Sequence, residues 1–284
     1  MRFGDLELHI VSDGRVWSDA GGPFGLVPRS LYESVIEPDK DNKIPMMLNC
    51  MLVRSEGLTI LIDTGLGDKL TPEARDFWGL ERPDGGLLQA LQRLDVSPED
   101  VDLVIDTHFH ADHCAGNTRI EGGDVVPTFP RAEYWVQRLE WAEASHPDAR
   151  TRGTYFHENF IPIWEAGKLR LLQGDTQVTR HLRCVVTPGH TRGHQSIMFE
   201  SDEWTGMYVA DMASYAIHME KIAWLTSYDV LPLENIRTKQ IWRHWAIEKN
   251  AWLFFEHDPE ITIARFKEEN GRYKIDPLDP PLDD

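Results

Sequence analysis

Cysteine is scarce in this chain, and the three cysteines present are not paired. Cys50, Cys114 and Cys184 are scattered along 284 residues, and their number is odd. A metal site built from thiolates needs cysteines at paired spacing. The sequence therefore excludes such a site, and any metal must be bound by other side chains.

Long hydrophobic runs are also missing. No stretch approaches the roughly twenty apolar residues that a helix needs to cross a bilayer. The N-terminal residues 1–5, Met-Arg-Phe-Gly-Asp, reach an acidic residue at once, and no charged start followed by an apolar run is present. Because a secretory signal has that pattern, we expect a cytoplasmic protein without a membrane partner.

Basic residues are few compared with acidic ones. The chain has 29 Lys and Arg against 47 Asp and Glu, which gives a formal net charge of −18. Such a charge repels phosphate backbones, so we expect no nucleic-acid partner and no nuclease acting on a polymer. The solubility of the protein is by itself a sufficient explanation of this net charge, without any specific partner. With 41% hydrophobic residues, the chain can still bury one large core.

Metal-binding side chains are concentrated in one short run. Residues 107–113 read Thr-His-Phe-His-Ala-Asp-His, directly after the apolar run 101–106, which is typical of a buried strand. His108 and His110 point the same way in an extended segment, and Asp112 and His113 follow at the turn. Imidazole and carboxylate ligands suit Zn²⁺ and its neighbours Fe, Mn and Co. The run predicts a site for more than one metal.

The run His108-Phe-His110-Ala-Asp112-His113 resembles the HxHxDH signature of the metallo-β-lactamase superfamily of binuclear metallohydrolases. This resemblance implies further ligands downstream, and residues that match them follow apolar runs in the expected order: His190, Asp211 and His257. It implies that one metal is bound by His108, His110 and His190. A second is bound by Asp112, His113 and His257, with Asp211 between the two. Two zinc ions are expected, with Fe, Mn or Co as alternatives.

Periodicity alone predicts an α/β or α+β fold. The resemblance implies an αββα sandwich, in which two mixed sheets lie face to face with helices outside, formed by two similar halves. We expect one catalytic domain over residues 1–275 and a loose, acidic, proline-rich tail over 276–284. Strands and helices are expected as follows: strands at 6–11, 47–54, 58–62, 101–106, 134–136, 184–186 and 207–210, helices at 86–94, 136–144 and 231–250, and a closing hairpin at 261–266 and 272–275.

Hydrolysis is the reaction that this site predicts. A hydroxide bridging two metals is a nucleophile at neutral pH, and Asp112 or Asp211 can move a proton to the leaving group. Asp211 counts against a true β-lactamase. Residues 187–196, 210–215 and 254–258 resemble the N-acyl homoserine lactonases. We therefore expect opening of a lactone or cleavage of a small ester.

Tyr215 is a candidate substrate contact. In such lactonases a tyrosine three residues after the bridging aspartate hydrogen-bonds the substrate, whereas Tyr215 comes four residues after Asp211. The glycine-rich apolar segment 21–28 and the ten tryptophans suit a small substrate with an apolar or acyl portion. A homodimer is left open.

Other functions remain as alternatives. The same site serves organophosphate hydrolases and glyoxalase-II-like thioesterases. A di-iron oxidoreductase is disfavoured because such enzymes carry a flavin-binding partner domain, for which this chain is too short. A non-catalytic binding protein is disfavoured because no ligand is missing.

Two further residues have two interpretations each. Asp63, in an Asp-Thr-Gly turn, either supports a ligand histidine or only forms the turn, and His194 is either a ligand or, as we expect, a supporting or packing residue.

Overall fold

Two seven-stranded mixed sheets form the centre of the protein. The computed structural model describes residues 1–3, 6–201 and 204–278. The strand order of the first sheet is β1 (Arg2–Phe3), β2 (Leu6–Asp19), β3 (Lys43–Ser55), β4 (Leu58–Ile62), β5 (Leu103–Ile105), β8 (Glu133–Gln137) and β9 (Leu169–Leu172). The order of the second is β10 (Thr176–Thr179), β11 (Leu182–Val186), β12 (Gln195–Glu200), β13 (Thr205–Tyr208), β14 (Trp252–Phe254), β15 (Ile263–Glu269) and β16 (Arg272–Pro277). Strands β6 (Thr118–Glu121) and β7 (Asp124–Pro127) form a separate hairpin.

The side chains of the central strands alternate between two cores. In β5, Leu103 and Ile105 pack into a core shared by both sheets, whereas Val104 faces the opposite way. In the second sheet, Tyr208 and Phe254 contribute to the shared core, while their neighbours Met207 and Leu253 face outward. Because successive side chains of a strand point to opposite faces, nearly continuous apolar runs mark strands that are covered on both sides.

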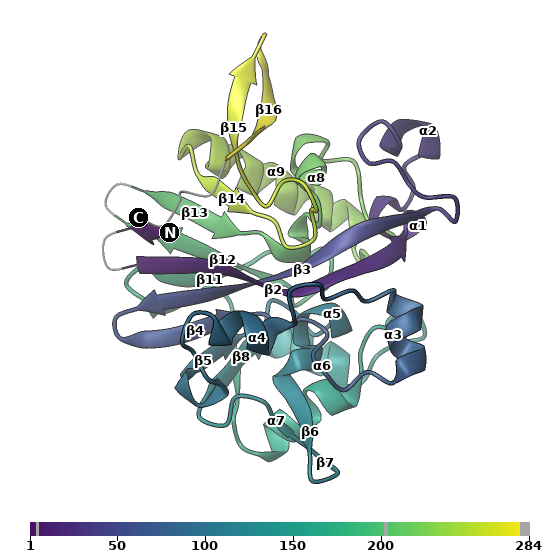
Figure 1. Cartoon of the computed structure of the whole chain (residues 1–284). Coiled ribbons are helices and arrows are strands. Elements are labelled where there is room, and N and C mark those ends of the chain that lie inside the picture. Colours follow the sequence, from purple (N-terminus) through teal and green to yellow (C-terminus); the bar gives the residue numbers. More distant parts are fainter. Residues whose placement is uncertain (4–5, 202–203, 279–284) are drawn as a thin grey trace.

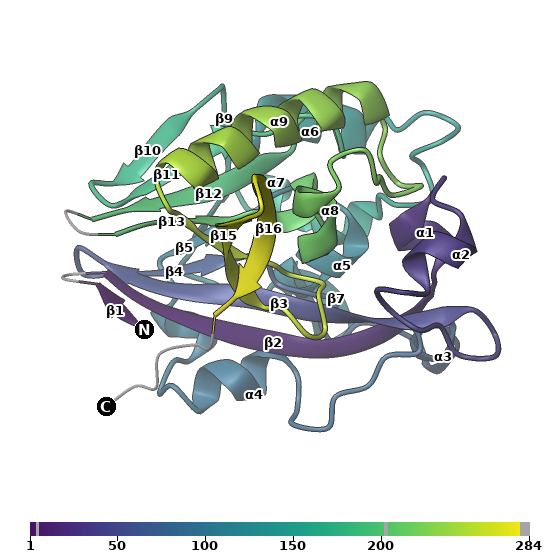
Figure 2. The same cartoon turned by 90° about the horizontal axis from the view of Figure 1, so that it is seen from above.

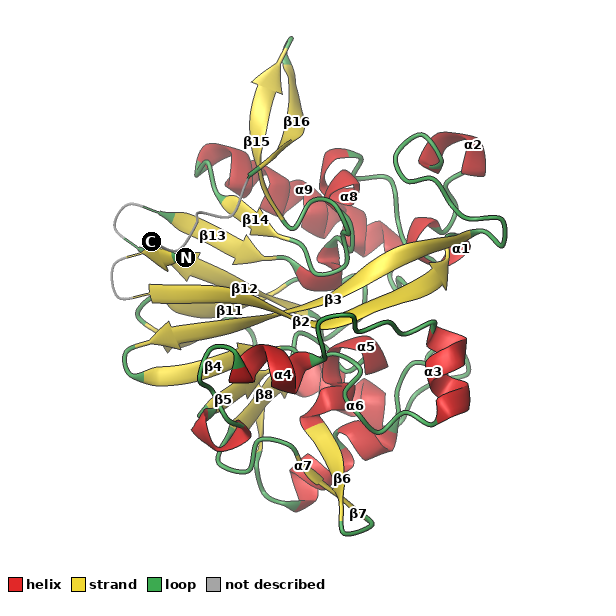
Figure 3. Ribbon diagram, in the orientation of Figure 1, coloured by secondary structure: helices red, strands yellow, loops and turns green. Residues whose placement is uncertain are grey.

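Helices supply the two outer layers. Viewed from above, α9 lies on the outside of the second sheet and α4 on the outside of the first, with the two sheets between them (Figure 2). The helices are α1 (Gly21–Phe24), α2 (Arg29–Tyr32), α3 (Pro72–Trp78), α4 (Leu87–Gln92), α5 (Ala111–Cys114), α6 (Arg138–Ser145), α7 (Ile161–Glu165), α8 (Ala216–Glu220) and α9 (Pro232–Glu248) (Figures 1 and 3). This arrangement confirms the predicted αββα sandwich. Within the described part of the chain, no helix has the length and apolar content needed to span a membrane.

Strand direction places the loops that bear the predicted ligands at one edge. Strands β4, β5 and β8 are parallel neighbours, and so are β13 and β14. Strand β11 is antiparallel to β12, which is antiparallel to β13, so β11 also runs with β13. The carboxyl ends of parallel strands meet at the same edge of a sheet, which is where ligands usually bind.

Two expectations need correction. The first strand, expected at 6–11, continues beyond residue 11, because the pairing of β2 with β3 only shifts register between Ser12 and Arg15 and then continues to Asp19. Gly14, with φ 113°, permits this irregularity. The expected loose tail is ordered at its start, since β16 runs to Pro277 and Leu278 packs against the shared core. Residues 279–284 of that tail lie outside the described residues.

Candidate metal centre

The predicted ligands of residues 108–113 are gathered by an extended segment followed by one helical turn. His110 immediately precedes α5, with φ −64° and ψ 151°, and α5 carries Asp112 and His113. The ring centroids of His108 and His113 are 4.0 Å apart, and those of His108 and His110 are 4.5 Å apart. The turn after β5 therefore brings the three histidine rings together.

The remaining predicted ligands come from three strand ends of the second sheet. His190 follows β11, Asp211 lies in the 3₁₀ turn η4 (Ala210–Met212) after β13, and His257 follows β14. Gly189 has φ 144°, and a β-carbon there would lie 2.4 Å from the Cα of Asn235, so a larger residue does not fit. Ala210 has a left-handed φ of 47° directly before Asp211. Such strain in a non-glycine residue is common at functional sites.

The seven predicted ligands form two adjoining groups. In each group the potential ligand atoms lie within 4.8 Å of one another: His108, His110, His190 and Asp211 in the first, and Asp112, His113 and His257 in the second. Asp211 contacts both. Its Oδ2 lies 3.0 Å from Nε2 of His190 and 3.5 Å from Nε2 of His113, and its Oδ1 lies 3.3 Å from Nε2 of His257.

The donor set fits a pair of divalent metals. Nε2 of His108 is buried and has no hydrogen-bond partner among the described residues. Nε2 of His113 and Nε2 of His257 face each other at 3.2 Å, and Nδ1 of His110 faces Nε2 of His190 at 3.0 Å. Facing imidazole nitrogens need a proton or a cation between them. Five imidazoles and two carboxylates suit Zn²⁺, Fe, Mn or Co.

The electrostatics divide the histidines, because the pKa is lowered at His108 and His110 but raised at His113, His190 and His257. Burial and the neighbouring imidazoles hold the pKa of His108 and His110 well below the usual value. Burial also opposes protonation of His190, but the carboxylates of Asp211 and Asp229 outweigh it and raise the pKa of His190 to about 10. In return, the histidine charges overcome the burial of Asp211 and hold its pKa well below its usual range. Metal binding requires neutral imidazoles, so it would displace the proton of His190.

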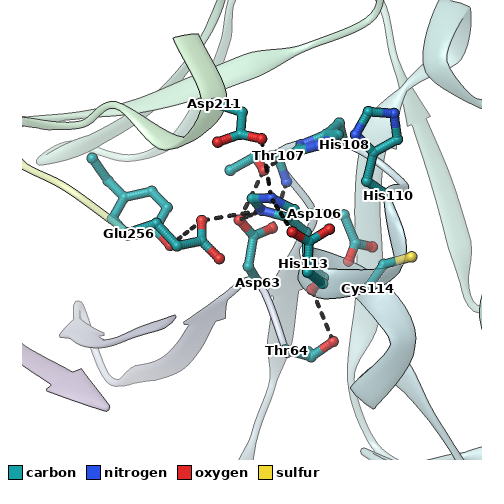
Figure 4. Close-up of polar contacts among 12 residues, drawn as sticks. Asp63, Thr64, Asp106, Thr107, His108, His110, His113, Cys114, Asp211 and Glu256 are labelled. Atoms are coloured by element: carbon teal, nitrogen blue, oxygen red, sulfur yellow. Dashed lines mark hydrogen bonds and ion pairs between the residues drawn. The ribbon is translucent and has the colours of Figure 1, made fainter. Parts of the chain in front are cut away.

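Two buried carboxylates orient His113. Asp63 Oδ2 lies 3.1 Å and Glu256 Oε2 lies 3.0 Å from Nδ1 of His113 (Figure 4). Asp63 also accepts hydrogen bonds from the backbone N–H and the hydroxyl of Thr107, both at 2.8 Å. Both interpretations of Asp63 left open by the sequence are therefore present, the contact with a candidate ligand histidine and a turn conformation at φ 55°. Such partners fix the ring orientation of a ligand histidine and raise its basicity.

Other ligand histidines are fixed in the same way. Nδ1 of His190 lies 3.0 Å from Asp229 Oδ1, and Nδ1 of His257 lies 2.7 Å from the carbonyl oxygen of Met47. Nδ1 of His108 lies 3.1 Å from the hydroxyl of Thr107. Each of these contacts leaves Nε2 directed into the ligand groups.

Sequence reasoning missed two of these supporting residues. Glu256 is a charged residue at the end of the apolar run 252–255 and directly precedes His257, so its position could have signalled a buried role. Asp229 lies in the connection between α8 and α9, 39 residues after its partner His190. No local pattern marks it, because the contact depends on the fold.

Three singled-out residues lie beside the ligand groups. The Tyr215 side chain is buried, and its hydroxyl donates to the carbonyl oxygen of Pro45 at 2.8 Å. Nδ1 of His194 lies 2.8 Å from the hydroxyl of Thr187, and its ring packs 5.2 Å from that of His108, outside both ligand groups. Cys114 is buried and donates its S–H to the carbonyl oxygen of Phe109.

Comparison with known proteins agrees with this geometry. The model of the Metallo-beta-lactamase superfamily matches residues 44–238. An N-acyl homoserine lactonase of Bacillus cereus is 25% identical over 266 residues, covering 89% of this chain and 94% of the relative.

Solved structures share the fold. A crystal structure of a probable metal-dependent hydrolase from Staphylococcus aureus superposes with a TM-score of 0.89 at 25% identity, covering 99% of this chain and 100% of the other. AidC, described as a dizinc quorum-quenching lactonase in complex with the product N-hexnoyl-L-homoserine, gives a TM-score of 0.80 at 21% identity, covering 98% and 96%.

Proposed function

Since this chain belongs to the metallo-β-lactamase superfamily of hydrolases, we propose that it is a binuclear metal-dependent hydrolase that opens a lactone or cleaves a small ester. The observation that carries the proposal is the position of Asp211, whose two oxygens contact histidines of both ligand groups. A carboxylate between two groups of imidazoles is what a pair of neighbouring cations requires. The lactonase relatives support the substrate class.

His108, His110 and His190 would bind one metal, Asp112, His113 and His257 the other, and Asp211 both. Two divalent ions, for which we propose zinc, would when bound supply a water of lowered pKa and polarise the substrate carbonyl. Asp63 and Glu256 orient His113, and Asp229 orients His190.

Asp112 is the better placed carboxylate for proton transfer to the leaving group. Asp211 accepts a hydrogen bond from the Ser214 hydroxyl at 2.7 Å and is held by three histidines. The Asp112 side chain is 14% exposed, against 6% for Asp211, and approaches His113 and His257 only at 4.0 and 3.8 Å. We therefore assign proton transfer to Asp112 Oδ2 and a bridging role to Asp211.

The role of Tyr215 as a substrate contact stays a prediction. The carbonyl oxygen of Pro45 competes with a substrate for the Tyr215 hydroxyl.

The proposed substrate is small, with an apolar or acyl portion, and neither a nucleic acid nor a membrane is a proposed partner. Aromatic side chains lie on the side of the candidate metal centre where α1 is found. Phe24 packs against Tyr215 at 5.6 Å and against Trp224 at 6.0 Å between ring centroids. The net charge of −18 opposes polyanions. A cytoplasmic location and a homodimer stay predictions.

The test combines metal analysis with kinetics. Purified protein is loaded with Zn²⁺, Fe²⁺, Mn²⁺ or Co²⁺, its metal content per chain is measured, and turnover is assayed on lactones, aryl esters, thioesters and organophosphates. We expect two metals per chain and the highest kcat/KM on a lactone or ester. His110→Ala should lose metal and turnover, whereas His244→Ala, an exposed histidine on α9, should keep both. A protein with two bound metals and no lactone or ester turnover would sink the proposal.

A further inference from the structure

Four tyrosines lie near the ligand groups, and the hydroxyls of three are already engaged. The Tyr155 hydroxyl donates to Glu140 Oε1 at 3.0 Å, that of Tyr208 to Glu256 Oε2 at 2.7 Å, and that of Tyr215 to the carbonyl oxygen of Pro45 at 2.8 Å. These three side chains are buried. Tyr228 differs, because it is 38% exposed and its hydroxyl meets Ser18 Oγ at 3.4 Å, the limit of a hydrogen bond. Of the four, Tyr228 keeps a hydroxyl that another molecule can engage.

The backbone of Tyr228 is fixed relative to His190. Its neighbour Asp229 accepts from the Thr226 hydroxyl at 3.1 Å and contacts Nδ1 of His190 at 3.0 Å. The next residue, Val230, donates its N–H to the carbonyl oxygen of His190 at 2.9 Å. The connection between α8 and α9 is thus joined to the candidate ligand His190 directly after Tyr228, which fixes the backbone that bears the phenol.

The ring of Tyr228 reaches across to α1 and the end of β2. The N–H of Ser227 donates to the carbonyl oxygen of Gly22 at 2.8 Å, which joins the two segments. A β-carbon at Gly22 would lie 2.0 Å from the Tyr228 hydroxyl oxygen. Glycine at this position is therefore required for the phenol to occupy its place.

The Tyr228 hydroxyl is a donor at neutral pH, because burial raises the pKa of Tyr228. Asp112 and Asp211 lie close enough for their charges to act on the phenol. The ligands themselves are imidazoles and carboxylates, which bind metals through lone pairs and donate nothing to a neutral ester. Tyr228 adds a hydrogen-bond donor to a site made of acceptors.

We propose that the Tyr228 hydroxyl, in place of that of Tyr215, donates a hydrogen bond to an oxygen of the bound lactone or ester. The inference rests on the proposed function, since it names a specificity-determining residue of the same site. Gly22 provides the space that the hydroxyl occupies. The contact orients the ester group with respect to the metal ligands and discriminates against substrates that lack an acceptor at that position.

The first test compares single hydroxyl deletions on the metal-loaded enzyme. Tyr228→Phe should lower kcat/KM for the best lactone or ester about tenfold, as expected for the loss of one hydrogen bond to substrate, with metal content unchanged. Tyr273→Phe is the matched control, because Tyr273 has the same exposed fraction of 38% and lies on β16. Tyr215→Phe is the rival variant. A tenfold loss in Tyr215→Phe without a loss in Tyr228→Phe would overturn the assignment.

The second test moves the hydroxyl without deleting it. Gly22 lies in α1, so alanine is accepted by the backbone but displaces the phenol. Gly153→Ala is the control, because a β-carbon there meets nothing within 4 Å and its φ is ordinary. If Gly22 acts through Tyr228, then Gly22→Ala should lower kcat/KM in the wild-type background and have little effect in the Tyr228→Phe background. Additive losses would contradict the inference.

The two proposals fail in different ways. Absence of lactone and ester turnover in the metal-loaded wild type overturns the proposed function and this inference with it. Turnover in the wild type with an unchanged kcat/KM in Tyr228→Phe overturns the inference alone.

Discussion

Glu140 on α6 joins the two loops that bear the first group of ligands, and its removal should loosen the centre. Its Oε1 accepts from the backbone N–H of Phe109 at 3.0 Å and from the Tyr155 hydroxyl at 3.0 Å, and its Oε2 accepts from the Thr191 hydroxyl at 2.5 Å. Phe109 lies between two ligand histidines, and Thr191 follows His190. The carboxyl group is fully buried, and burial raises its pKa.

The contacts set the size of the effect. Glu140→Ala leaves three buried donors without an acceptor, each of which costs about 1–3 kcal/mol. Because water can enter the space left by the side chain and satisfy some of them, we expect a loss of about 3–5 kcal/mol in the free energy of unfolding. Glu140→Gln keeps an oxygen for Phe109 and Tyr155, and its amide can donate to the Thr191 hydroxyl. This variant should lose only about 1 kcal/mol.

Urea denaturation of the metal-free protein measures these losses, and metal titration of each variant measures the effect on the centre. Glu143→Ala is the control on the same helix. Its side chain is 24% exposed and pairs with Arg192 at 2.7 Å, so we expect a loss of at most about 1 kcal/mol. The reasoning is refuted if Glu140→Ala unfolds within about 1 kcal/mol of the wild type, or if Glu140→Gln is as damaging as Glu140→Ala.

Three further predictions concern the ligand groups and their surroundings. Asp211→Asn should reduce metal content below two per chain and abolish turnover. The circular dichroism spectrum should be retained, because the core strands do not depend on this carboxylate. Full metal content in this variant would count against the bridging role of Asp211. Asp229→Asn should weaken metal affinity about 10–100-fold by removing the charged partner of His190, as measured by competition with a chelator; unchanged affinity would contradict that role. The buried Lys239, whose pKa is lowered to about 8 by desolvation, should destabilise the fold while it is protonated. Between pH 8 and pH 10.5 the unfolded chain binds more protons than the folded chain, so stability should rise with pH. The difference in unfolding free energy between the wild type and Lys239→Met should therefore increase by about 3 kcal/mol over this range. A difference that does not change with pH would contradict the assignment.

The candidate ligands at residues 108–113 could be picked out from the sequence because metal-binding side chains directly follow the buried strand β5. His190, Asp211 and His257 were located through the resemblance, which implies ligands after later strands such as β13. The resemblance supplied their grouping. Apolar runs of strand length that alternate with helical patterns predicted only an α/β or α+β fold, and the resemblance supplied the αββα sandwich.

Residues that act through long-range contacts could not be predicted. The offset of Tyr215 from Asp211 says nothing about the direction of its hydroxyl, which depends on Pro45, 170 residues earlier. Tyr228 and Asp229 lie in a connection without periodicity. Their positions follow from the packing of that connection against Gly22 and His190.

Neither half of the chain holds all seven candidate ligands. The first sheet contributes His108, His110, Asp112 and His113, and the second contributes His190, Asp211 and His257, so each ligand group contains residues from both sheets. A metal that binds only the assembled site stabilises the packing of one sheet on the other by mass action. The shared core, which joins Leu103 to Tyr208 and Phe254, holds the sheets together independently of the metals. The stabilisation from metal binding should therefore be concentrated at the edge where the strands end, in the loops after β5, β11, β13 and β14, while the exchange protection of the central strands depends on the apolar core.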